Sequence, residues 1–169
     1  MSELKLPVYT ETVNASICGP CGGACCRQGP GTTAPQDFGS SPQEMLESMI
    51  LRLSSGMWIA ERYFSPFVID DGESVTHVIA DVSEILAIRP GTKRTGACVF
   101  WQSGKGCTIF DTRPTGCRTL VPVASHVLDH ACRQPHADGV ALTRSWIEHQ
   151  PEVLAAVLAT GVTPQDSSW

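Results

Sequence analysis

The sequence has few aromatic residues and no long hydrophobic run. Aromatic residues make up 7% of its 169 residues and hydrophobic residues 42%, so we expect a single domain with a small core. No stretch approaches the length of a transmembrane helix, and the first ten residues have no apolar run typical of a secretory signal. We therefore expect no membrane partner and a cytoplasmic location.

Positive charge is also in short supply. Twelve Lys and Arg stand against 17 Asp and Glu, which gives a formal net charge of −5. Because no basic stripe offsets this charge, a nucleic-acid partner is disfavoured. The chain also lacks a G-x-S-x-G elbow, a phosphate-binding loop and a dinucleotide fingerprint. Whether it is an enzyme stays open at this stage.

Cysteine is abundant by contrast, and the eight cysteines fall into two groups. Four lie within one nine-residue window rich in glycine, and four are spread over a later block. The groups are Cys18, Cys21, Cys25 and Cys26, and then Cys98, Cys107, Cys117 and Cys132. In a reduced cytoplasm such thiols are more often metal ligands than disulfides. Both zinc and iron–sulfur clusters use thiolate ligands, so the sequence predicts one or the other.

The spacing in the first group favours a metal site. Two residues separate Cys18 from Cys21, which is the reach of a metal knuckle. The two glycines after Cys21 permit positive φ and let backbone amides approach sulfur. Cys25 and Cys26 are neighbours, so their side chains diverge unless the backbone is distorted. The chain then holds two sites, or one site and one spare thiol, and the spacing does not separate zinc from an iron–sulfur centre.

The second group lies in a predicted hairpin. Short runs at 97–101 and 106–110 flank a Ser-Gly-Lys turn, and this pattern is typical of two paired strands. We expect these strands to carry Cys98 and Cys107.

Two arginines bracket the next cysteine. Arg113 and Arg118 lie on either side of Cys117 within a short turn. Cations beside thiolates lower the thiol pKa and offset the negative charge of the site. We therefore expect both arginines to lie close to the metal-binding thiolates.

Five segments carry a resemblance to a known family. They are Cys18-x2-Cys21-x3-Cys25-Cys26, Gly96-Ala97-Cys98-Val99-Phe100 with Gly106-Cys107-Thr108-Ile109-Phe110, Arg113-Pro114-x-x-Cys117-Arg118, and Cys132-Arg133. In these segments, over residues 16–135, the chain resembles the YkgJ-type cysteine-cluster family, also called the CxxCxxCC or zinc- or iron-chelating domain. The resemblance implies metal chelation through the eight cysteines and no particular reaction.

The remaining patterns predict a mixed α+β fold. Ser41-Pro42-Gln43-Glu44 is a capping box that begins a helix, and Gly56 ends it. Further elements are expected as strands at 57–64, 67–70 and 75–79, an undecided helix or strand at 82–88, and C-terminal helices within 140–160. We expect one small, loop-rich cysteine-cluster domain over 1–169, in which a β-hairpin has helices on its flanks.

Three functions fit these observations. The first is a metal-binding module whose ion ties the N-terminal loop to the hairpin and contributes folding energy. The second is an iron–sulfur-dependent enzyme or electron-transfer component that acts on a small substrate. The third is a metal delivery or sensing protein with labile thiolates.

Overall fold

The computed structural model describes residues 22–63, 67–70, 75–79, 84–122, 132–133 and 136–167. Cys18 and Cys21 lie outside these ranges, as do a strand-like lead-in that the sequence predicts at 1–15 and a turn that it predicts at Asp71-Gly72. The described elements are, in chain order, α2 (Ala24–Gln28), η1 (Pro35–Asp37), α3 (Pro42–Ser54), β1 (Trp58–Tyr63), β2 (Phe67–Asp70), β3 (Val75–Ile79), β4 (Ile85–Pro90), β5 (Trp101–Gln102), β6 (Gly106–Cys107), η2 (Phe110–Thr112), α4 (Thr115–Arg118), β7 (Val121–Pro122), β8 (Cys132–Arg133), α5 (His136–Ser145), η3 (Ile147–His149), α6 (Gln150–Thr160) and β9 (Gln165–Asp166).

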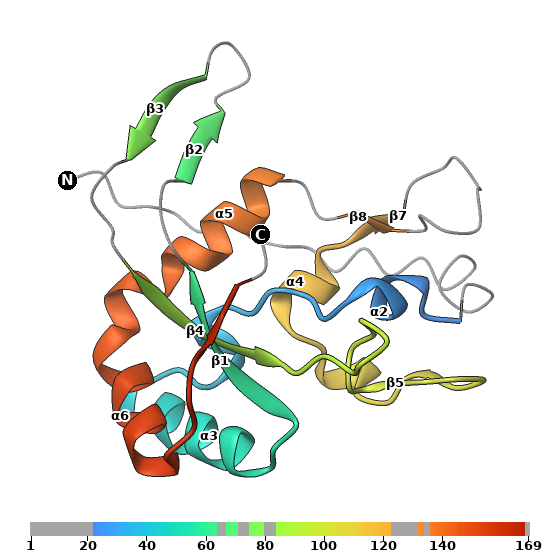
Figure 1. Cartoon of the computed structure of the whole chain (residues 1–169), viewed down its shortest axis with the longest axis horizontal. Coiled ribbons are helices and arrows are strands. Elements are labelled where there is room, and N and C mark those ends of the chain that lie inside the picture. Colours follow the sequence, from blue (N-terminus) through green and yellow to red (C-terminus); the bar gives the residue numbers. More distant parts are fainter. Residues whose placement is uncertain are drawn as a thin grey trace.

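Helices and a small sheet form the body of the molecule, so the predicted α+β class is confirmed. The sheet has the order β4-β1-β9, with β1 antiparallel to β4 and parallel to β9. Helices α3 and α6 pack against each other, α3 contacts β1, and α6 contacts β4 (Figure 1). Within the described ranges, no helix combines the length and apolar character that crossing a bilayer requires.

The predicted capping box of the first long helix is confirmed. The Ser41 side chain accepts a hydrogen bond from the Glu44 amide, and the Glu44 carboxylate accepts one from the Ser41 amide. Three side chains at helical spacing then turn inward, and Met45, Met49 and Leu53 are all buried. The helix ends at Ser54, so the predicted stop near Gly56 also holds.

Four of the described aromatic residues meet in one core. Phe38 packs edge-on against Trp58 and Trp146, and Trp58 lies against Phe100, with ring centroids 5.4 to 5.8 Å apart. The Arg52 guanidinium lies 4.4 Å from the Phe38 centroid and 4.5 Å from that of Trp58. Cys26 and Cys98 belong to the same cluster of buried residues. The cysteine region is therefore continuous with the hydrophobic core.

The hairpin is shorter than predicted, and the expectation that its strands carry both cysteines is wrong for Cys98. Of these two cysteines, only Cys107 lies on a strand, in β6. Cys98 forms an isolated bridge with Thr92, because the Lys93 amide donates to the Ala97 carbonyl and closes a separate turn. Residues 97–98 therefore pair with the preceding segment and are not part of the hairpin.

The other boundaries follow the local sequence closely. The undecided stretch at 82–88 contains the start of a strand, β4. Helix α5 begins at His136, earlier than the predicted 140, whereas α6 has Pro151 in its first turn and Gly161 as its left-handed C-cap.

Candidate metal centre

Helix α2 places two cysteines next to the hairpin. Gly22 and Gly23 precede it with φ of 61° and 80°, a left-handed conformation that favours glycine. A side chain at Gly23 would also lie 3.1 Å from the Trp101 ring, so its absence lets β5 approach. The Trp101 indole N–H donates to the Gly22 carbonyl at 3.1 Å. Glycines in the cysteine window therefore serve a close approach as well as a turn.

A chain of thiols joins the two cysteine groups. The Cys98 amide donates to the Cys26 carbonyl at 2.7 Å and ties α2 to the segment before the hairpin. The Cys26 thiol changes the pKa values of Cys25, its neighbour on α2, and of Cys107 on β6, so the three side chains lie near one another. The fold therefore brings thiols together that are 81 positions apart in the sequence.

The directions of their pKa shifts divide these thiols into two kinds. The hydrogen bond from Cys26 lowers the pKa of Cys25 to about 6 and that of Cys107 to about 7, and the charge of Arg113 lowers both further. The same hydrogen bonds raise the pKa of Cys26, and burial adds to this. Without metal, Cys25 and Cys107 therefore ionise more readily than Cys26.

The other two described thiols of the second group are more enclosed. Burial raises the pKa of Cys98, and it raises that of Cys117 to about 12. The Cys117 sulfur rests on Gly31, where any Cβ would overlap it, and a backbone hydrogen bond from Gly31 partly opposes the rise. The charges of Cys25, Cys98 and Cys107 also raise the pKa of Cys117, so its sulfur lies within electrostatic reach of the other thiols.

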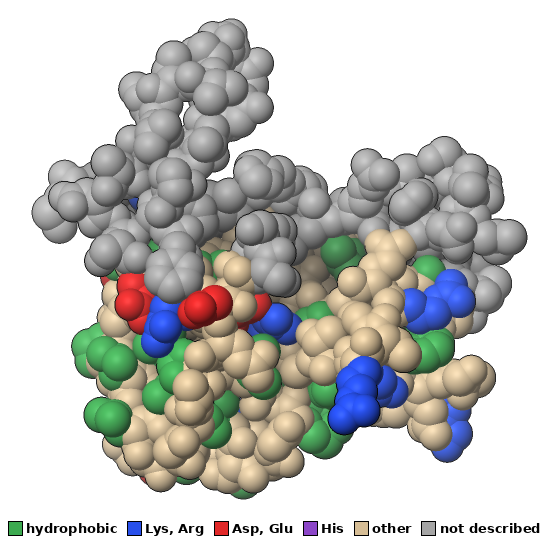
Figure 2. Space-filling model, in the orientation of Figure 1, with side chains coloured by type: hydrophobic (Ala, Val, Ile, Leu, Met, Phe, Trp, Pro, Cys, Tyr) green, Lys and Arg blue, Asp and Glu red, His purple; other side chains and the backbone are tan. Residues whose placement is uncertain are grey.

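The two bracketing arginines have different surroundings. Arg113 donates from Nε to the Phe110 carbonyl at 2.7 Å, and its guanidinium stacks 3.6 Å from the centroid of the Phe110 ring. Its positive charge is near enough to Cys25 and Cys107 to lower their pKa values. Arg118 forms an ion pair with Asp37 at 2.9 Å. Figure 2 shows Lys and Arg side chains, and no Asp or Glu, over the described part of this face that holds α2 and β5.

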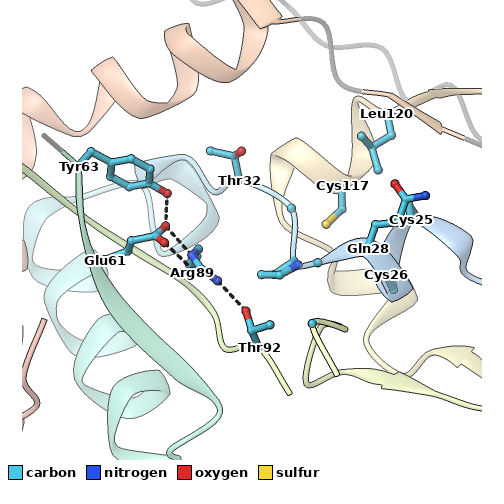
Figure 3. A pocket seen from close by; sticks show the side chains of 14 residues that line it. Cys25, Cys26, Gln28, Thr32, Glu61, Tyr63, Arg89, Thr92, Cys117 and Leu120 are labelled. Atoms are coloured by element: carbon cyan, nitrogen blue, oxygen red, sulfur yellow. Dashed lines mark hydrogen bonds and ion pairs between the residues drawn. The ribbon is translucent and has the colours of Figure 1, made fainter. Parts of the chain in front are cut away.

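A cavity of about 560 Å³ lies beside the thiols. Cys25, Cys26 and Cys117 line one side of it, and Figure 3 shows a polar group on the other. There Arg89 donates from Nε and Nη2 to Glu61 at 2.5 and 2.6 Å.

Two further side chains complete this polar group. The Tyr63 hydroxyl donates to Glu61, and Arg89 Nη1 donates to the Thr92 hydroxyl at 3.2 Å. Burial, followed by the charge of Glu61, raises the pKa of Tyr63. Glu61, Tyr63 and Arg89 were not found by sequence reasoning, because nothing in their spacing marks them as a group.

The donor set fits a thiophilic metal in its chemistry. Thiols from both cysteine groups lie near one another, and soft thiolates select zinc or iron–sulfur clusters. Cys132 lies on β8, while Cys18 and Cys21 are outside the described ranges. Among the residues that are described, no three His, Cys, Asp or Glu side chains are arranged to hold an ion together. The described thiols are thus one part of the predicted ligand set.

Comparison with known proteins gives one match. The family model CxxCxxCC, described as "Putative zinc- or iron-chelating domain", matches residues 17–133. The matched range contains all eight cysteines and ends before α5. The chain has three residues between Cys21 and Cys25, one more than the motif that names the family. No curated protein and no solved structure matches the chain.

Proposed function

The chain belongs to the CxxCxxCC family of zinc- or iron-chelating domains, and from this premise we propose that its cysteines hold zinc or an iron–sulfur centre. The observation that supports this most directly is the proximity of Cys25, Cys26 and Cys107, which draws on both cysteine groups. The proposed ligands are all eight cysteines, namely Cys18, Cys21, Cys25, Cys26, Cys98, Cys107, Cys117 and Cys132.

The described residues would contribute to binding in distinct ways. Thiolate is the form of cysteine that binds metal, and the lowered pKa values of Cys25 and Cys107 provide it near neutral pH. Cys26 would release its proton on binding, and Arg113 would offset part of the negative charge. A bound metal would supply folding energy by joining α2 to the hairpin.

Metal and sulfide analysis after anaerobic purification tests this proposal. Stoichiometric zinc in a colourless protein, or iron with acid-labile sulfide and visible absorption, is the expected result. Cys26→Ser and Cys107→Ser should each lose most of the metal, whereas Ser103→Ala in the exposed hairpin turn should keep it. A wild-type chain that retains no metal after reconstitution, or a Cys26→Ser chain with wild-type content, would contradict the proposal.

The cavity favours a second candidate, an iron–sulfur-dependent enzyme or electron-transfer component that acts on a small substrate. Its volume of about 560 Å³ is in the usual range for small-molecule sites, and it reaches three of the thiols. The same anaerobic preparation separates the candidates, because an iron-free zinc protein excludes redox chemistry at the centre. If iron and sulfide are present, small molecules that bind in the cavity should change the electron paramagnetic resonance spectrum of the reduced cluster.

The proposal places the protein in the cytoplasm, without a nucleic-acid or membrane partner. A reducing compartment keeps thiols available as ligands, and a net charge of −5 does not favour binding to phosphate groups.

A further inference from the structure

One carboxylate outside the cysteine groups is saturated with hydrogen bonds. Asp37 ends η1, and its side chain is only 5% exposed. Its Oδ2 accepts from the amides of Ala34 and Thr115, each at 2.9 Å. Its Oδ1 accepts from the Thr115 hydroxyl at 2.8 Å and from Arg118 Nη2 at 2.9 Å. A buried carboxylate with four donors is fixed in place, and so are the groups that donate to it.

These bonds hold the short helix that carries Cys117. Helix α4 has four residues, and its N-cap is Pro114, whose side chain cannot cap it. Asp37 caps it instead, from 78 positions earlier in the chain. The next amide along, that of Gly116, donates to the Thr32 carbonyl at 2.8 Å, and a Cβ at Gly116 would overlap the Thr32 backbone. The loop at 32–37 therefore holds the start of α4 in place through hydrogen bonds and close backbone contact.

The other side of Asp37 is attached to the core. Arg52 on α3 donates from Nη2 to the Asp37 carbonyl at 2.8 Å. Its guanidinium is held between the rings of Phe38 and Trp58. An unbroken series of contacts thus runs from the core helix α3 through Asp37 to the helix that carries Cys117.

We propose that Asp37 is the positioning residue for Cys117, and that it sets where this thiol meets the others. The proposal rests on the proposed metal-binding function. A four-residue helix does not persist in isolation, because its few hydrogen bonds do not offset the entropy of ordering it. Without the Asp37 bonds α4 loosens, and the Cys117 sulfur leaves Gly31 and the side of the cavity that it lines. In the intact protein, Arg118 affects the position of Cys117 by way of its ion pair with Asp37.

Cobalt(II) binding to the full chain under anaerobic conditions tests this inference, since each bound thiolate adds to the sulfur-to-cobalt charge-transfer absorption. Asp37→Asn and Cys117→Ser should each lose a similar part of this absorption and weaken Co²⁺ binding by about tenfold or more, as loss of a ligand-orienting group does. The double variant should bind no more weakly than Cys117→Ser alone. Asp111→Asn makes the same chemical change at an exposed acid and should match wild type.

A second readout is independent of metal. In metal-free protein, iodoacetamide labelling located by mass spectrometry should mark Cys117 at least about tenfold faster in Asp37→Asn than in wild type. Arg118→Ala removes only one of the four bonds and should shift both readouts in the same direction by less, which provides a test if Asp37→Asn does not fold. Wild-type labelling and Co²⁺ affinity in folded Asp37→Asn, or additive losses in the double variant, would overturn the inference. A wild-type chain that binds no Co²⁺ counts against the proposed function, and the labelling result still decides the role of Asp37.

Discussion

The buried ion pair on the far side of the cavity makes a quantitative prediction. Arg89 and Glu61 have side chains only 17% and 6% exposed and are joined at 2.5 and 2.6 Å. Arg89→Met removes the cation and leaves a buried carboxylate whose remaining described partner is the Tyr63 hydroxyl. Breaking a buried pair in this way destabilises a protein by about 3–5 kcal/mol. For a chain of this length, that corresponds to a fall in Tm of roughly 6–20 °C.

A neighbouring surface ion pair provides the control. Arg62 follows Glu61 on β1 and forms an ion pair with Glu84 at 2.6 Å, but these two side chains are 32% and 44% exposed. Solvent screens this pair, so Arg62→Met should change stability by less than about 1 kcal/mol.

Urea unfolding followed by circular dichroism, with and without metal, measures both variants. Equal and small losses for Arg89→Met and Arg62→Met would refute the reasoning. A triple variant, Glu61→Leu with Tyr63→Phe and Arg89→Met, removes the whole polar group and should recover most of the lost stability, because an apolar replacement leaves no charge unpaired. If this stable variant no longer binds a small molecule in the cavity beside the thiols, the role of the Glu61–Arg89 pair is ligand binding and not stability of the fold.

Three smaller perturbations test the site and its support. Gly116→Ala places a methyl group on the backbone of the preceding loop and should destabilise the chain by about 1–3 kcal/mol; thermal unfolding should show this loss, and wild-type stability would contradict the close approach. Ser41→Ala should lower the free energy of unfolding by about 1 kcal/mol in urea titrations, and no change would mean that the capping box is not formed. Because the pKa values of Cys25 and Cys107 lie below the ordinary 9.0, at about 6 and about 7, their alkylation in metal-free protein should accelerate as pH rises through 6 to 7, and a midpoint near 9 would contradict the thiol network.

Local signals in the sequence were sufficient for the elements that depend on neighbouring residues. The capping box at Ser41 and the glycine at 161 predict their helix ends, because both act within one turn. The hairpin was harder to predict: residues 97–98 have suitable strand composition, but a turn closed by Lys93 takes their backbone partners. The choice between two competing pairings depends on contacts that strand propensity does not contain.

The candidate site divides in the same way. Cysteine spacing identified the thiols, since the ligand type itself marks the chemistry. Asp37 and the pair Glu61–Arg89 gave no comparable signal, because an isolated acid in a loop or strand looks like any solvated acid. Their partners lie 78 and 28 positions away, and only the fold brings them together. The residues that support the site were therefore the hardest to find.

The indole of Trp101 lies across the glycines that precede α2, and its partner across the hairpin is Cys107. Trp58 and Trp146, by contrast, are enclosed in the core at 8% and 1% exposure. The described part of the chain thus contains optical probes in two places, one beside the thiols and two inside the core. Fluorescence of the half-buried Trp101, at longer wavelengths, should change when metal binds or leaves the cysteines. The blue-shifted fluorescence of Trp58 and Trp146 should change only when the core unfolds. One spectrum can therefore tell loss of metal apart from loss of structure.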